Sequence, residues 1–130
     1  MKNLRDYGLE TDNKNFVIAE IGINHGGSLA LAKKLIDSAL KTGCDSVKFQ
    51  TYITEKRAPK GNKEIFDILK SFELDFSDFK RIKDYCDEKN IIFFSTPFDE
   101  ESVDYLESIN CPIYKIASFD TVNTKLIEKI

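Results

Sequence analysis

The feature that most constrains this chain is a repeated alternation between short apolar runs and amphipathic segments. Four apolar runs occupy residues 16–22, 46–52, 91–98 and 113–119. Strand-like runs that alternate with helical segments favour a parallel sheet with helices packed outside it. The pattern therefore predicts an α/β fold in which each run is a strand.

Helix-forming segments lie between the predicted strands. Ser28 is a suitable N-cap for a helix that continues to about Thr42, and Gly43 is a suitable residue to end it. Further helices are predicted over 64–72, 78–88 (capped by Asp75 or Ser77) and 100–109, with another beginning at 124, whereas 54–61 is expected to be a polar loop.

Two architectures fit this alternation, an open doubly wound sheet and a (β/α)8 TIM barrel. A barrel needs about 250 residues, and this sequence has 130. We expect the first half of a TIM barrel, about four βα units, truncated within the fourth helix. Residues 1–15 would then be a lead-in, and 16–130 a partial barrel domain.

Polar side chains interrupt the apolar runs near their carboxyl ends. Side chains of a strand alternate between its two faces, so these polar groups share the face opposite to the apolar one. They are Glu20, Lys48 with Gln50, Thr96 and Lys115. Because the carboxyl ends of parallel strands meet at one edge, we expect these groups to converge there.

The converging groups allow two interpretations. Two lysines and a hydroxyl suit a phosphate or carboxylate ligand, and Glu20 could act on a proton or stabilise developing positive charge. Alternatively, Glu20 pairs with Lys48 or Lys115 as a structural ion pair. Spacing alone leaves both open.

The remaining candidate groups favour structural roles. His25, the only histidine, lies in a glycine-rich turn and is interpreted as a hydrogen-bonding group rather than a metal ligand. The nearby glycines match neither a GxGxxG fingerprint nor a Walker loop. The basic stretch 56–60 is interpreted as a solvated loop.

Composition excludes several classes of protein. A net charge of −3 and a pI of about 5.2 argue against nucleic acid or an anionic membrane as the main partner. From the sequence we expect no membrane span and no signal peptide. Three scattered cysteines are typical of reduced thiols, so we expect a cytoplasmic protein.

Four motifs at the predicted strand ends closely resemble the N-acetylneuraminate (sialic acid) synthase family, which includes pseudaminic and legionaminic acid synthases. They are IAEIGINHGG at 18–27, VKFQT at 47–51, FSTPF at 94–98 and YKIAS at 114–118. The resemblance covers about residues 15–130 and implies the amino-terminal part of a TIM barrel. In most full-length members a small antifreeze-like domain follows the barrel.

The resemblance also implies a reaction. Phosphoenolpyruvate would condense with an N-acetylated aldose such as N-acetylmannosamine, and water would add as phosphate leaves. Position by position, the residues implied to hold phosphoenolpyruvate are Lys48, Thr96, Lys115 and Ser118. Glu20 matches the acid near the reacting carbons. Gln50, Asn62 and Asp120 are candidate sugar contacts.

The resemblance further implies a divalent metal, Mn²⁺ or Mg²⁺, and a homodimer, with the metal-binding histidines beyond Ile130 and none in this chain. One departure concerns the sugar, because Ser118-Phe119-Asp120 stands where many members have Ser-Gly-Glu. Pseudaminic acid synthases share Ser-Phe there, whereas other motifs look more like the sialic or legionaminic branches. Alternatives are another phosphoenolpyruvate-using barrel or an inactive half-barrel binding fragment.

Overall fold

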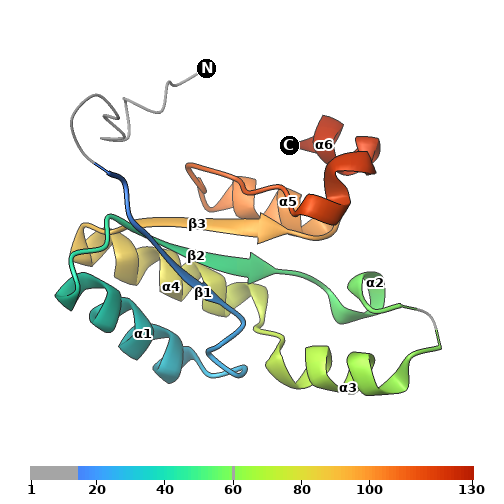
Figure 1. Cartoon of the computed structure of the whole chain (residues 1–130), viewed down its shortest axis with the longest axis horizontal. Helices are drawn as coiled ribbons and strands as arrows, with labels where there is room; N and C mark the ends of the chain where they lie inside the picture. The colour runs from blue at the N-terminus through green and yellow to red at the C-terminus, as the bar shows by residue number, and fades with distance from the viewer. Residues whose placement is uncertain (1–14, 60) are drawn as a thin grey trace.

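A computed structural model describes residues 15–59 and 61–130, so nearly all of the expected lead-in over 1–15 lies outside the described residues. Its centre is a parallel sheet in the order β1-β2-β3, and all three strands point the same way in Figure 1. The strands are β1 (Ile18–Gly22), β2 (Ser46–Thr51) and β3 (Ile92–Pro97).

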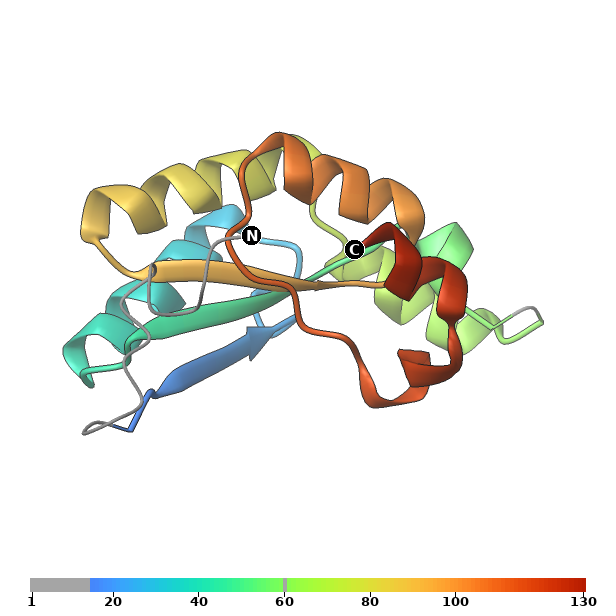
Figure 2. The same ribbon diagram turned by 90° about the horizontal axis from the view of Figure 1, so that it is seen from above.

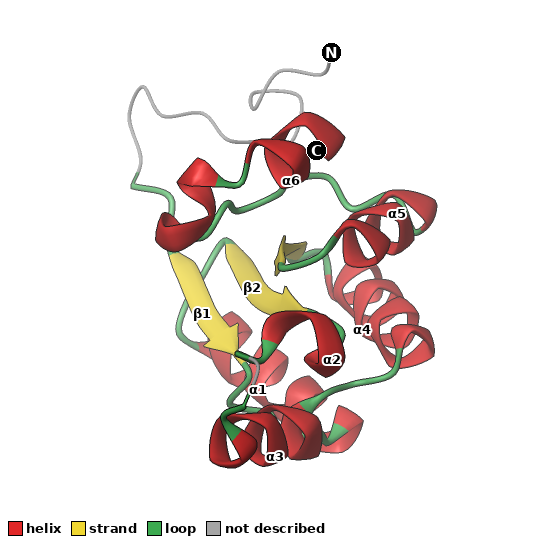
Figure 3. Ribbon diagram, turned by 90° about the vertical axis from the view of Figure 1, so that its right-hand side faces the viewer, coloured by secondary structure: helices red, strands yellow, loops and turns green. Residues whose placement is uncertain are grey.

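Helices follow the strands as the periodicity predicts. They are α1 (Leu29–Lys41), α2 (Thr54–Arg57), α3 (Lys63–Phe72), α4 (Phe76–Lys89), α5 (Glu100–Ser108), the 3-10 helix η2 (Ser118–Val122) and α6 (Thr124–Lys129). Helices α1, α4 and α5 contact the sheet and lie on the same side of it (Figures 2 and 3).

This arrangement separates the two architectures that the sequence left open. A doubly wound sheet reverses its strand order and carries helices on both faces, whereas a barrel adds strands in chain order with all helices outside. Here the order is sequential, and the helices that contact the sheet lie on one side. The predicted α/β fold with a partial TIM barrel is therefore confirmed.

The hydrophobic core fills the space between the sheet and these helices. Val47 and Phe49 of β2 have no exposed surface, and Ile36 of α1 and Ile82 of α4 are equally buried in the same cluster. Lys48 alternates with the two apolar residues and faces the other side of the sheet, as the two-residue period of a strand requires.

The loop after β1 is held by a close approach of two backbones. The Ser28 hydroxyl oxygen accepts a hydrogen bond from the Leu31 amide at 3.2 Å and begins α1 as predicted. Just before it, Gly27 adopts a φ of +73°, and a Cβ at this position would lie 2.6 Å from the carbonyl oxygen of Ser71 in α3. Only glycine fits this contact without displacing α3.

Two local predictions are wrong. Residues 54–57 form α2 rather than a loop. Residues 113–119 do not form a fourth strand: the segment makes one bridge to β3, between Ser95 and Tyr114, in which the Lys115 amide donates a hydrogen bond to the Ser95 carbonyl at 3.0 Å. In Figure 2 this segment crosses from the helical side of the sheet to the other side. An apolar period predicts which residues could pair, but it does not describe whether the backbone stays beside the neighbouring strand long enough to form a ladder.

No helix in the described part of the chain is long and apolar enough to cross a membrane.

Candidate anion-binding site

A cavity of about 430 Å³ lies at the carboxyl ends of the strands, on the side away from α1 and α4. All three strands, α2 and the segment before η2 contribute side chains to it. The polar and charged groups among them are Glu20, Asn24, Lys48, Gln50, Arg57, Thr96 and Lys115. The structure thus brings together the five groups that strand alternation predicts at one edge. We call this cavity the strand-end pocket.

Lys48 is the centre of the polar network in the strand-end pocket. Its amine lies 2.7 Å from a carboxylate oxygen of Glu20 and donates a hydrogen bond to the Thr96 hydroxyl at 3.2 Å. Glu20 and Lys48 are register partners across β1 and β2, so the pairing follows directly from the strand register. The residue is only 7% exposed, and a buried ammonium needs such partners.

The ion pair between Glu20 and Lys48 realises one of the two interpretations left open by the sequence. The other interpretation is compatible with it, because both partners line the strand-end pocket. The Glu20 side chain is 56% exposed, and a pair with one solvated partner contributes little to stability. Its carboxylate is therefore accessible to a ligand.

Gly22 creates the room in which Glu20 and Gln50 meet. A Cβ at Gly22 would lie 3.3 Å from a carboxylate oxygen of Glu20 and 3.6 Å from the amide nitrogen of Gln50. The backbone there has a φ of +59°, in a register irregularity of β1 that glycine tolerates. A side chain at this position would strain the backbone and crowd both polar groups.

Lys115 reaches the strand-end pocket from the irregular segment beside β3. Its backbone amide is fixed to Ser95, and its amine donates a hydrogen bond to the carbonyl of Ile116. Lys115 is exposed, unlike Lys48. The two amines therefore belong to the same pocket, one buried and paired, the other open to solvent.

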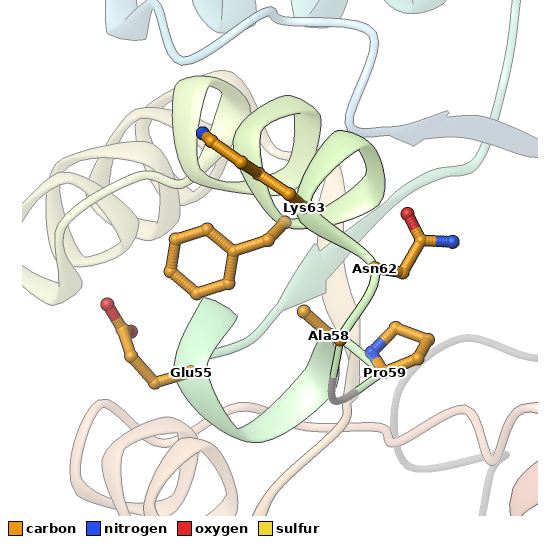
Figure 4. A pocket seen from close by; sticks show the side chains of 7 residues that line it. Glu55, Ala58, Pro59, Asn62 and Lys63 are labelled. Carbon is orange, nitrogen blue, oxygen red and sulfur yellow. The ribbon is translucent and has the colours of Figure 1, made fainter.

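Three predicted site residues do not line this pocket. Ser118 is exposed at the start of η2, and Asp120 is buried there with one oxygen accepting from the Asn123 amide at 3.3 Å. Asn62 caps α3 through its side-chain oxygen, which accepts from the Ile65 amide at 3.1 Å. It borders a separate cavity of about 440 Å³ beside Pro59 (Figure 4).

Two polar pocket residues were missed, Asn24 in the turn after β1 and Arg57 at the end of α2. Arg57 was placed in a solvated basic loop, but α2 turns it into the strand-end pocket, against Tyr52 and Phe98. Lys60, from the same stretch, lies outside the described residues. The sequence does contain an indication, since Tyr52 and Phe98 each directly follow a strand and offer rings to a nearby cation.

His25 occupies a structural position, as the sequence indicates. It is 1% exposed, and its Nδ1 accepts a hydrogen bond from the Gly27 amide at 3.2 Å. Burial lowers its pKa, an effect partly opposed by the Gly22 backbone. Within residues 15–59 and 61–130, no group of three or more His, Cys, Asp or Glu side chains could hold a metal ion.

Together, the parallel strands with outer helices and the cationic pocket at the strand ends define part of a barrel with a candidate site for an anionic ligand. Comparison with known proteins gives the family. A model of the NeuB family matches residues 35–130, and the chain belongs to this family.

Similar proteins carry the names of several sugar-acid synthases. The chain is 38% identical over 130 residues to the N,N'-diacetyllegionaminic acid synthase of Campylobacter jejuni, covering 90% of this chain and 39% of that protein. It is 32% identical over 133 residues to the pseudaminic acid synthase of the same species, covering 92% and 39%.

A solved structure gives the same result. The chain is similar to the N-acetylneuraminic acid (sialic acid) synthetase of Leptospira borgpetersenii, crystallised in complex with citrate, with a TM-score of 0.86 and 42% identity. The match covers 90% of this chain and 41% of that one. The chain thus spans about two fifths of the length of these relatives.

Proposed function

We propose that the protein containing this chain condenses phosphoenolpyruvate with an N-acetylated aldose and water, giving a nonulosonic (sialic-type) acid and phosphate for cell-surface carbohydrate synthesis. The observation that carries the proposal is the convergence of Glu20, Lys48, Thr96 and Lys115 in the strand-end pocket. The resemblance to the family assigns the same four positions to phosphoenolpyruvate and to the reacting carbons.

The chemistry of the substrate fits these groups. Phosphoenolpyruvate presents a phosphate and a carboxylate, and Lys48, Thr96 and Lys115 supply two ammonium groups and a hydroxyl that can donate to them. Carbon 3 of the enol attacks the aldehyde carbon of the open-chain sugar, the aldehyde C=O π bond breaks and its oxygen takes a proton to become a hydroxyl, and carbon 2 becomes an oxocarbenium centre. A carboxylate beside that centre stabilises its positive charge, and we assign this role to Glu20.

The addition of water completes the reaction. Water adds to carbon 2, and the carbon–oxygen bond to the phosphate breaks, so phosphate leaves. Glu20 can also take the proton that the water loses. Gln50, whose amide faces Glu20 across Gly22, is the group that we assign to the sugar. Ser118, Asn62 and Asp120 lie outside the strand-end pocket, and we give them no role in it.

We also propose a divalent metal, Mn²⁺ or Mg²⁺, for the whole protein. The described residues do not fit such a site, because they contain no cluster of potential ligands and Glu20 is paired with Lys48. No step is therefore derived through the metal. Residues 16–130 are proposed to belong to a synthase barrel, which an antifreeze-like domain would follow in a homodimeric protein.

The test is phosphate release by the protein at its natural length. We expect release that requires phosphoenolpyruvate together with N-acetylmannosamine or a diacetylated hexose, and the hexose that is used identifies the sialic, legionaminic or pseudaminic type. Release with arabinose phosphate or erythrose phosphate instead would contradict the proposal, as would phosphoenolpyruvate binding without any turnover. Chelation is expected to abolish release, and Mn²⁺ or Mg²⁺ to restore it.

A further inference from the structure

We propose that Arg57 is a second oxyanion-binding group of the strand-end pocket, separate from Lys48, Thr96 and Lys115. Its ligand is a carboxylate or phosphate group carried by a substrate. The inference rests on the proposed function, since it concerns the substrates of the same pocket.

The guanidinium of Arg57 is held by two aromatic rings, each of which directly follows a different strand. Its central carbon lies 3.9 Å from the centroid of Phe98 and 4.5 Å from that of Tyr52. Tyr52 is 3% exposed, and its hydroxyl donates a hydrogen bond to the Leu69 carbonyl at 2.9 Å, so this ring is fixed. Contact with ring faces orients a planar guanidinium while leaving its N–H groups free for a ligand.

Phe119 adds a third ring to the aromatic wall that Tyr52 and Phe98 form beside Arg57. Its ring stacks on Phe98 with centroids 5.8 Å apart and planes 16° apart, although Phe119 is 65% exposed. Both rings line the strand-end pocket with Arg57. The wall therefore covers the guanidinium with apolar surface and lowers the local dielectric, which strengthens its attraction for an anion.

The guanidinium lacks a partner for part of its donor set. It carries five N–H donors and no acceptor, and its Nη1 is buried without a hydrogen-bond partner among the described residues. Burial lowers the pKa of Arg57, while Tyr52 and Asp120 oppose that effect. Asp120 also has a buried oxygen without a partner, and no ion pair joins the two side chains in the described part of the chain. An oxyanion would offset the cost of this desolvated cation.

The charge balance of the pocket points the same way. Its lining contains three cations, Lys48, Arg57 and Lys115, against one acid, Glu20. Glu20 is paired with Lys48, so the pocket cations that form no ion pair with another described residue are Arg57 and Lys115, which come from different segments of the chain. Two such cations suit two oxyanion groups. The second group is either the carboxylate of the enol phosphate or a phosphate on the acceptor sugar.

The test measures binding rather than turnover, in the protein at its natural length. Dissociation constants would be determined by calorimetry for phosphoenolpyruvate, N-acetylmannosamine 6-phosphate and N-acetylmannosamine, using Arg57→Met and Arg57→Lys. We expect Arg57→Met to weaken one anionic ligand by about 10- to 100-fold. Arg57→Lys should lose less affinity, because lysine keeps the positive charge but lacks the planar pair of N–H donors of the guanidinium. If only the affinity for phosphoenolpyruvate falls, Arg57 binds the carboxylate of the enol phosphate. If only the affinity for N-acetylmannosamine 6-phosphate falls, Arg57 binds the phosphate of the acceptor sugar.

Two control variants exclude other causes. Arg81→Met removes an exposed arginine from α4 and should change no affinity. Asp120→Asn tests whether Arg57 merely balances a buried acid. The proposal is overturned if the dissociation constants of both anionic ligands for Arg57→Met stay within about twofold of those of the parent protein. It is also overturned if Arg57→Met only lowers thermal stability, as Asp120→Asn does. Failure of the proposed function would appear instead as absent phosphate release, which leaves this binding result unaffected.

Discussion

The two faces of β2 differ sharply although they belong to one strand. Val47 and Phe49 have no exposed surface and pack toward α1 and α4, whereas Lys48 and Gln50 face the strand-end pocket. Because consecutive residues point to opposite sides, a single residue step separates the part of the strand that stabilises the fold from the part that meets a ligand. Substitutions on the two faces should therefore have separable effects.

The largest effect is expected on the buried face. Phe49→Ala removes a ring whose centroid lies 5.8 Å from that of Phe93, and it leaves a cavity in the core. We expect the free energy of unfolding to fall by about 3–5 kcal/mol, measured by urea denaturation. Leu31→Ala, at a residue that is 40% exposed, is the matched control and should cost far less. Equal losses would mean that the core does not depend on this face.

The pocket face should respond in turnover rather than stability. Glu20→Gln removes the charge that we assign to the oxocarbenium centre, so the rate of phosphate release should fall by about 100- to 1,000-fold. The urea midpoint should fall less than in Phe49→Ala, because the Glu20 side chain is 56% exposed and Lys48 keeps its hydrogen bond to Thr96. Glu64→Gln, on the exposed surface of α3, serves as the control. Near-normal turnover would remove Glu20 from the mechanism.

A smaller effect is expected at Lys115. Because this lysine is exposed and its amine donates to the Ile116 carbonyl of the chain's own next residue, Lys115→Met should leave the fold intact. It should weaken phosphoenolpyruvate binding about tenfold, as measured by calorimetry, through loss of a charged donor. Lys34→Met removes an exposed lysine of α1 for comparison. Unchanged affinity would count against a role for Lys115 in holding the phosphate.

The smallest effect concerns pH and the buried imidazole ring of His25. His25 lies 6.0 Å from Phe49 between ring centroids, and burial lowers its pKa below 6.5. The unfolded chain therefore takes up the proton first, and stability that is complete above pH 6.5 is lost as the pH falls through the lower folded pKa. The slope cannot exceed about 1.4 kcal/mol per pH unit.

His25→Gln isolates this contribution from the carboxylates that titrate in the same range. The variant loses stability at every pH, but the difference from the parent protein should shrink as the pH is lowered from 7 to 5. A difference that stays constant over this range would show that the ring carries no pKa shift relevant to folding. The difference in the free energy of unfolding is measured from denaturation curves of the variant and the parent protein at each pH.

Much of the fold could be predicted from local sequence, because strand and helix periods depend on which face is buried. The alternation in β2 correctly predicted that Lys48 would face away from Phe49, and Ser28 correctly predicted the start of α1. The apolar run 113–119 has the same pattern, yet it makes one bridge. Its pairing depends on neighbouring strands, which a local period does not describe.

The site was predicted in part for the same reason. Glu20, Lys48 and Thr96 meet because register fixes them across neighbouring strands, and a regular sheet makes such positions calculable. Arg57 and Asn62 lie on connections, where a short helix and a cap decide the direction of each side chain. Spacing along the chain contains little information about either.

The close approach at Gly27 has a consequence for how this protein can change over generations. Any side chain at residue 27 would collide with the Ser71 carbonyl, so the turn and the end of α3 form a matched pair. A larger residue at position 27 is tolerated only if α3 has shifted away from it. A shift of α3 while glycine remains at position 27 leaves a void. Descendants of this sequence should therefore vary the two together or not at all.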